Sequence, residues 1–163
     1  MLKKKLGDQS QLEIFKGRYG KLYIRDRSYD FNISHSDDYV VGIISEYDIG
    51  IDIENIYNVS KEKLRRFFCK EEINYCNSAI DTCKIWTLKE SYLKCIGLGI
   101  NVPLNSFSVI TNDKMLLSIN GNENMYYSFS SKKIDNYVIS VCTTQCNIPN
   151  IDYEYKEIKE LVY

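Results

Sequence analysis

Residues 49–54, Ile-Gly-Ile-Asp-Ile-Glu, alternate apolar and polar side chains. A period of two is typical of a β-strand, because successive side chains of a strand point to opposite faces. The pattern predicts a strand with Ile51 and Ile53 on the core side and both acids, Asp52 and Glu54, together on the other face, and we expect Asp52 to be exposed there. From periodicity alone, a solvated edge strand accounts for the two acids as well as a functional site does.

The segments around this strand predict an α+β fold. Strands are expected at 21–26, 31–34, 39–45, 106–111, 115–119, 125–130 and 137–142, where β-branched and aromatic residues gather. Helices are expected from Ser60, from Lys70 to about Ala79 and from Asp81 to Ile96. Strands, then helices, then strands indicate an antiparallel sheet with helices packed on one side. The short link 46–48 predicts a hairpin between 39–45 and 49–54.

Composition limits the classes of function. The 163 residues, 44% of them hydrophobic, fit one core, and a formal net charge of −1 gives no general attraction to nucleic acid or membrane. No apolar run approaches the roughly 18 residues of a membrane span, and polar residues follow Met1–Lys5 where a signal peptide needs apolar ones. Six cysteines without a C-x-x-C, beside one histidine, favour a reduced chain without zinc. We expect a cytoplasmic protein.

Two segments carry residues suited to phosphate and metal chemistry. Like charges repel on a short strand, and the hard oxygens of Asp52 and Glu54 suit Mg²⁺. In the third predicted helix, Trp86, Glu90 and Lys94 recur every four residues on one face. An ordinary surface ion pair between Glu90 and Lys94 is the competing interpretation.

A third segment, Phe31–Ser36, sets the only histidine between two serines near the end of a strand. Adjacent side chains of an extended strand point apart, so a nucleophilic serine activated by this histidine is poorly supported. Two interpretations remain: Ser34 and His35 contact a phosphate, or they cap a turn.

These three segments, in this order, resemble the motifs of the Sfp-type 4′-phosphopantetheinyl transferases. The matching stretches are Phe-Asn-Ile-Ser-His-Ser, Gly-Ile-Asp-Ile-Glu, and Trp-Thr-Leu-Lys-Glu-Ser-Tyr-Leu-Lys followed by Gly-x-Gly. Agreement continues in Arg65–Phe68 with Glu72 and in Val102–Val109. The resemblance implies an enzyme that moves phosphopantetheine from coenzyme A to a serine of an apo acyl or peptidyl carrier protein and releases adenosine 3′,5′-bisphosphate.

The resemblance also implies roles for the catalytic residues. Asp52, Glu54 and Glu90 would hold Mg²⁺ against the diphosphate. Glu90 would accept the proton of the carrier serine, directly or through a water on the metal. Lys94, one turn further along the helix, would neutralise phosphate.

On the nucleotide side, the resemblance assigns Ser34 and His35 to the 3′-phosphate. Lys21, in Tyr19-Gly20-Lys21, resembles the family's lysine that approaches the coenzyme, although Leu22 stands where the family has proline.

The same resemblance divides the chain into a remnant of the family's N-terminal half (1–30), a catalytic domain (31–148) and a tail (149–163). A homo-oligomer or a separate N-terminal partner would restore the first half. Two other functions stay open. One is a non-catalytic or partner-dependent module that binds coenzyme A or carrier proteins. The other is a two-acid magnesium phosphohydrolase, which explains Asp52 and Glu54 but leaves the other two segments without a role.

Overall fold

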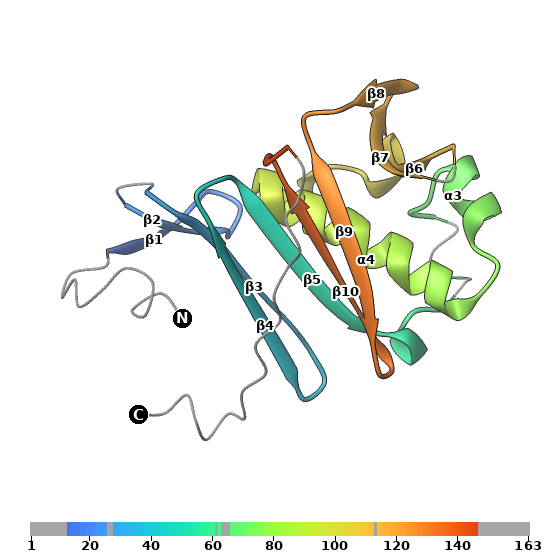
Figure 1. The fold of residues 1–163 in the computed structure, drawn as a ribbon, viewed down its shortest axis with the longest axis horizontal. Coiled ribbons are helices and arrows are strands. Elements are labelled where there is room, and N and C mark those ends of the chain that lie inside the picture. The colour runs from blue at the N-terminus through green and yellow to red at the C-terminus, as the bar shows by residue number, and fades with distance from the viewer. Residues whose placement is uncertain (1–12, 26–27, 61, 63–65, 113, 147–163) are drawn as a thin grey trace.

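The computed structural model describes residues 13–25, 28–60, 62, 66–112 and 114–146. The predicted α+β class is confirmed (Figure 1). The strands are β1 (Ile14–Lys16), β2 (Leu22–Ile24), β3 (Asp30–Ser36), β4 (Tyr39–Ser45), β5 (Ile49–Asn55), β6 (Phe107–Thr111), β7 (Lys114–Ile119), β8 (Asn122–Asn124), β9 (Ser128–Ile134) and β10 (Tyr137–Thr143). The helices are α3 (Lys70–Tyr75) and α4 (Ala79–Ile96), with 3₁₀ turns η1 (Ile56–Asn58), η2 (Gly99–Asn101) and η3 (Leu104–Ser106).

The central sheet is antiparallel, with strand order β5-β10-β9, and α4 lies across one of its faces (Figure 1). Helix α4 begins two residues before the predicted Asp81, because Ser78 and Asp81 form a reciprocal capping box. It ends as predicted at Gly97, whose φ of 70° is the left-handed conformation that glycine adopts without strain.

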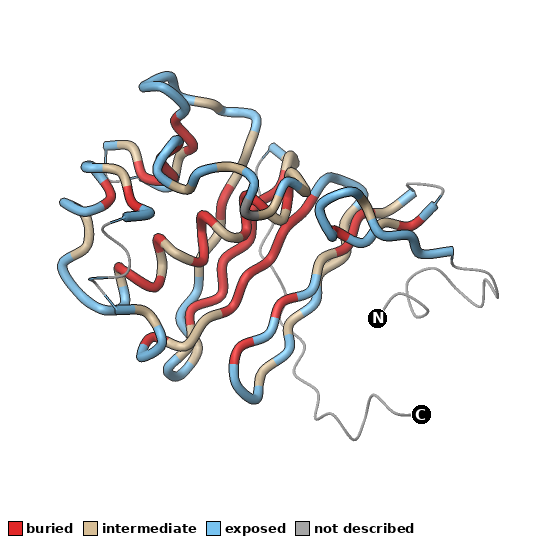
Figure 2. Tube along the Cα trace, turned by 180° about the vertical axis from the view of Figure 1, so that it is seen from behind, coloured by how far each residue is buried: buried red, intermediate tan, exposed pale blue. Residues whose placement is uncertain are grey.

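Strand β5 is buried on both faces, as Figure 2 shows for the middle of the sheet. Its isoleucines form a core cluster onto which Tyr39, Val41 and Ile43 of β4 pack. Its other face meets α4 so closely that a Cβ on Gly50 would lie 2.1 Å from the carbonyl oxygen of Ser91. The predicted alternation along β5 is therefore confirmed, but the face that carries the acids is covered by a helix.

The predicted hairpin between β4 and β5 is wrong. Strand β4 pairs with β3, whereas the backbone of β5 pairs with β10. The other edge of β5 is closed by side chains of β3, which accept hydrogen bonds from alternate backbone N–H groups of β5. We call these four contacts the edge ladder: Asp30 with Ile49 (2.8 Å), Asn32 with Ile51 (3.1 Å), Ser34 with Ile53 (3.4 Å) and Ser36 with Asn55 (3.1 Å).

The later strands deviate from the predicted boundaries. The strand predicted at 125–130 forms as β9, over Ser128–Ile134, and β8 precedes it after a turn with positive φ at Asn120 and Gly121. Residues 61 and 63–65 of the helix predicted from Ser60, and the whole tail 149–163, lie outside the described residues, and residues 66–68 form a turn and a bend rather than a helix. Within the described residues, no helix is long and apolar enough to cross a membrane.

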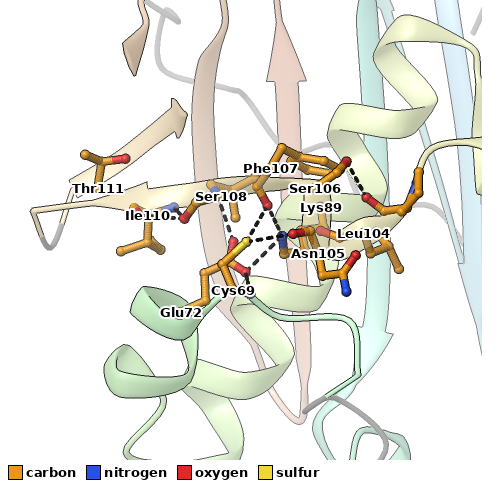
Figure 3. A network of polar contacts seen from close by, with 12 residues as sticks. Cys69, Glu72, Lys89, Leu104, Asn105, Ser106, Phe107, Ser108, Ile110 and Thr111 are labelled. Atoms are coloured by element: carbon orange, nitrogen blue, oxygen red, sulfur yellow. Dashed lines mark hydrogen bonds and ion pairs between the residues drawn. The ribbon is translucent and has the colours of Figure 1, made fainter. Parts of the chain in front are cut away.

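A buried ion pair joins the two helices to β6 (Figure 3). Lys89 Nζ lies 2.9 Å from Glu72 Oε2, and both side chains are fully buried. The lysine also donates to the carbonyls of Leu104 (2.7 Å) and Phe107 (2.5 Å), and Glu72 accepts from the backbone N–H groups of Cys69 and Val109. Burial lowers the pKa of Lys89, and the carboxylate of Glu72 opposes that shift. The network connects α3, α4, η3 and β6 through charged hydrogen bonds.

Replacing Lys89 by methionine is expected to lower the free energy of unfolding by about 3–5 kcal/mol, because Glu72 would remain buried without its cation. Urea unfolding measures the loss. The matched control is Lys70→Met, which removes an exposed lysine from the first turn of α3 and should cost less than about 0.5 kcal/mol. Equal stability of the two variants would contradict a structural role for the pair.

Candidate active site

Asp52 is the buried centre of the site. Its exposed fraction is 6%, because it projects from β5 toward α4. Burial raises the pKa of Asp52, and the negative charge of Glu54 adds to that shift, while Lys94 and Ser34 oppose it. The expectation that Asp52 is exposed is wrong, because periodicity in one strand does not report the helix that packs over it.

Asp52, Lys94 and Ser34 form a closed triangle of contacts. Lys94 Nζ lies 2.6 Å from Asp52 Oδ1 and 2.7 Å from Ser34 Oγ, and Ser34 Oγ donates to the same Oδ1 at 2.8 Å. The three residues come from α4, β5 and β3. Residues from all three motif segments of the sequence thus meet at one carboxylate oxygen, Asp52 Oδ1.

Glu54 is held through one oxygen as well. Its Oε1 accepts hydrogen bonds from Ser36 Oγ (2.6 Å), the backbone N–H of Asn55 (2.8 Å) and Asn58 Nδ2 (3.1 Å). The tip of the β3–β4 hairpin supports this arrangement, because Asp37 accepts from Asn55 Nδ2 at 2.7 Å. Asn55 also caps η1, the turn that carries Asn58.

Glu90 lies on α4, one turn before Lys94, and is half-buried. Its carboxylate accepts no hydrogen bond from the described residues. Burial raises the pKa of Glu90, the negative charge of Asp52 raises it further, and Lys94 opposes both. The two carboxylates are therefore close enough to repel each other, as groups that share a cation do.

A cavity of about 360 Å³ adjoins this cluster. Its wall combines cationic, aromatic and aliphatic side chains with glycine backbone: Lys16, Tyr19, Gly20, Lys21, Leu22, Phe31, Asn32, Ile33, Leu93, Lys94, Gly97 and Gly99. Lys94 belongs both to the carboxylate cluster and to the cavity wall. Lys94 thus connects the cavity to Asp52.

The structure separates Ser34 from His35. Ser34 is buried and faces β5, whereas His35 is exposed on the opposite face of β3, which it shares with Ile33. Because the one proton of the Ser34 hydroxyl is already donated to Asp52, the hydroxyl would donate to a phosphate only by giving up that bond.

The ammonium of Lys21 is also fully hydrogen-bonded within the protein. Its ammonium donates to Asp30 Oδ2 (2.5 Å) and to the carbonyls of Ile49 (3.0 Å) and Cys95 (2.9 Å). A lysine has three N–H donors, so all of them are used. Lys21 connects β2, β3, β5 and the last turn of α4, and it contributes to the cavity wall.

The three carboxylates offer oxygen donors, the ligand type that a divalent cation such as Mg²⁺ prefers. Among the described residues, no group of three or more His, Cys, Asp and Glu side chains is arranged to hold a metal ion, and Lys94 is the cation that pairs with Asp52. The oxygen chemistry nevertheless fits Mg²⁺. Asp52 Oδ2, Glu54 Oε2 and the carboxylate of Glu90 accept no hydrogen bond from the described residues.

Comparison with known proteins identifies the family. Residues 48–142, more than half of the chain, match the sequence model of the 4′-phosphopantetheinyl transferase superfamily. The chain belongs to this superfamily. It is 31% identical to the 4′-phosphopantetheinyl transferase gsp of Aneurinibacillus migulanus over 153 residues, and 31% identical to the 4′-phosphopantetheinyl transferase Sfp of Bacillus subtilis over 151 residues.

These alignments cover 90% and 87% of this chain but 64% and 67% of the two relatives. The chain thus spans about two thirds of the length of these 4′-phosphopantetheinyl transferases. Among solved structures, a holo-(acyl-carrier-protein) synthase from Bacillus anthracis aligns with a TM-score of 0.49 and 16% identity, over 59% of this chain and 93% of that one.

The residues that sequence reasoning missed are those that orient the superfamily motifs. Ser36 and Asn58 hold Glu54, Asp30 holds Lys21, and Lys89 anchors the helix that carries Glu90. One signal was present: Asp30, Asn32, Ser34 and Ser36 are polar at every second position of a strand. Such alternation is ordinarily assigned to a solvated face, and only the position of β5 identifies it as the edge ladder.

The ion pair at the centre of the site leads to a prediction about stability. With EDTA present, Asp52→Ala should lower the free energy of unfolding by about 1–3 kcal/mol, because buried Ser34 and half-buried Lys94 lose their shared acceptor. Asp52→Asn should lose less, since the amide oxygen still accepts both bonds and no charge is buried. Urea unfolding separates the variants. If Asp52→Ala is as stable as the wild type, Asp52 is exposed rather than buried.

Proposed function

We propose that this chain transfers the 4′-phosphopantetheinyl group of coenzyme A to a serine of an apo acyl or peptidyl carrier protein, in a Mg²⁺-dependent reaction. The observation that carries the proposal is the position of Lys94. Its ammonium contacts Asp52 and its side chain lines the cavity, so a diphosphate at this end of the cavity would meet the lysine that is bound to Asp52.

Asp52, Glu54 and Glu90 would hold the magnesium ion. Each strand acid is held by protein donors through one oxygen, and the second oxygen accepts no hydrogen bond from the described residues. The mutual repulsion of these partly buried acids favours a cation between them. When bound, the ion would neutralise charge that develops on the diphosphate during transfer.

Glu90 would act as the general base. The oxygen of the carrier serine forms a bond to the phosphorus that bears pantetheine, its proton goes to the Glu90 carboxylate, and the bond to the second phosphate breaks. Adenosine 3′,5′-bisphosphate leaves, with its new negative charge beside the Lys94 ammonium. The raised pKa of Glu90 supports this role, because it makes the carboxylate a stronger base.

The cavity would receive the nucleotide part of coenzyme A. Its aromatic and aliphatic wall suits a base, and Lys16 offers charge to phosphate. His35, on the same face of β3 as the wall residue Ile33, would contact the 3′-phosphate. Lys21 would shape the wall through its fixed position, because its ammonium is already bound by Asp30. Ser34 would act through Asp52 and Lys94.

Mass spectrometry tests the proposal directly. Apo acyl carrier protein and an apo peptidyl carrier domain, incubated with the protein, coenzyme A and Mg²⁺, should gain the mass of phosphopantetheine on serine. Glu90→Gln should lower the rate constant by about 10²–10⁴-fold, the usual contribution of a general base. EDTA should abolish transfer.

The matched control is Glu71→Gln, the same change at an exposed position of α3, which should leave the rate unchanged. Transfer at the wild-type rate by Glu90→Gln would contradict the role of Glu90. Binding of coenzyme A by calorimetry without any adduct on either carrier would contradict the enzyme and favour a non-catalytic binding module.

A further inference from the structure

Two serines in β3 face two acids in β5 in the same register. Ser34 Oγ donates to Asp52 Oδ1 at 2.8 Å, and Ser36 Oγ donates to Glu54 Oε1 at 2.6 Å. Along each strand, the residue of the second pair follows that of the first by two positions. Ser34 and Ser36 are almost fully buried, with exposed fractions of 6% and 5%. One strand therefore presents a matched set of hydroxyls to the acids of its neighbour.

Each serine also belongs to the edge ladder, and this fixes the direction of its proton. Ser34 Oγ accepts a hydrogen bond from the Ile53 N–H, and Ser36 Oγ accepts one from the Asn55 N–H. In each case the backbone N–H of the residue after the acid occupies one lone pair of the serine oxygen. A hydroxyl has one proton to donate. With the acceptor side engaged by the backbone of β5, that proton points to the carboxylate.

This arrangement selects one oxygen of each acid. Asp52 Oδ1 and Glu54 Oε1 are the oxygens that the serines bind, and the other oxygen of each acid takes no hydrogen bond from the described residues. We propose that Ser34 and Ser36 are positioning residues that hold the two carboxylates with their second oxygens presented to a divalent cation. This inference rests on the proposed function, because it requires that the acids bind the ion.

Asn32 separates this role from simple closure of the sheet edge. Its side chain accepts a hydrogen bond from the Ile51 N–H at 3.1 Å, in the same ladder, but it makes no hydrogen bond to a carboxylate of the described residues. An amide or carboxylate oxygen suffices to close the edge. A hydroxyl at positions 34 and 36 additionally donates, which is what an acid in the facing position requires.

The test measures metal binding rather than turnover. Mn²⁺ is titrated into the full chain with saturating coenzyme A and no carrier protein, and free Mn²⁺ is followed by electron paramagnetic resonance. Ser34→Ala and Ser36→Ala should each weaken Mn²⁺ binding by about 10–100-fold, as loss of a group that orients a ligand does. Ser45→Ala, the same change at a β4 serine that accepts the Tyr47 N–H and lies outside the cavity wall, should bind Mn²⁺ as the wild type does.

A second pair of variants separates the hydroxyl from packing. Threonine and valine have the same shape, so Ser36→Thr should retain most of the Mn²⁺ affinity and Ser36→Val should lose it, even if Ser36→Ala does not fold. Equal affinity of Ser36→Thr and Ser36→Val, or wild-type affinity in both alanine variants, would overturn the positioning role. Wild-type affinity in Asp52→Asn, or no binding by the wild type, would instead overturn the metal site of the proposed function and this inference with it.

Discussion

The open edge of strand β5 is the constraint on which the rest of the structure depends. One edge pairs with β10, and the N–H groups of the other edge find no backbone acceptor among the described residues. A buried N–H without an acceptor is costly, so each needs a partner. The β3 side chains Asp30, Asn32, Ser34 and Ser36 supply the acceptors at every second position. This edge ladder sets the register between β3 and β5, and a shift by one residue would turn every acceptor away.

That register has chemical consequences, because β3 and β5 carry polar residues of opposite hydrogen-bonding character. Ser34 and Ser36 meet Asp52 and Glu54 only while the ladder is in register. Helix α4 then covers the acids at close range, since Gly50 has no side chain to keep it away. Covered carboxylates repel one another, and Lys94 offsets part of that repulsion. The same packing that stabilises the sheet thus creates an acidic site suited to a cation.

The sequence predicted those parts of the molecule that depend on local pattern. The alternation in 49–54, the end of the long helix at Gly97 and the α+β order are confirmed because strand periodicity and capping act between near neighbours. The motifs also predicted that Asp52 and Lys94, far apart in the chain, belong to one site, and the structure brings them into contact.

What the sequence did not predict depends on packing between distant segments. Three findings follow from where β3 and α4 lie relative to β5. Strand β4 pairs with β3 instead of forming a hairpin with β5, Asp52 is buried, and the Lys21 ammonium is bound by Asp30. Ser34 and His35 are adjacent in sequence, yet the strand turns them to opposite faces. Lys89 precedes Glu90 in a recognisable motif, but its partner Glu72 becomes apparent only when α3 and α4 are packed together.

We propose that Asp52, Glu54 and Glu90 hold one divalent cation beside a cavity that receives coenzyme A. This is open to test by a crystal structure of the protein with coenzyme A and Mn²⁺, measured at a wavelength where manganese scatters anomalously. We expect a single anomalous peak within coordination distance of Asp52 and Glu90, with the diphosphate on its other side and Lys94 in contact with a phosphate oxygen. A coenzyme bound without such a peak, or a peak away from these carboxylates, would contradict it.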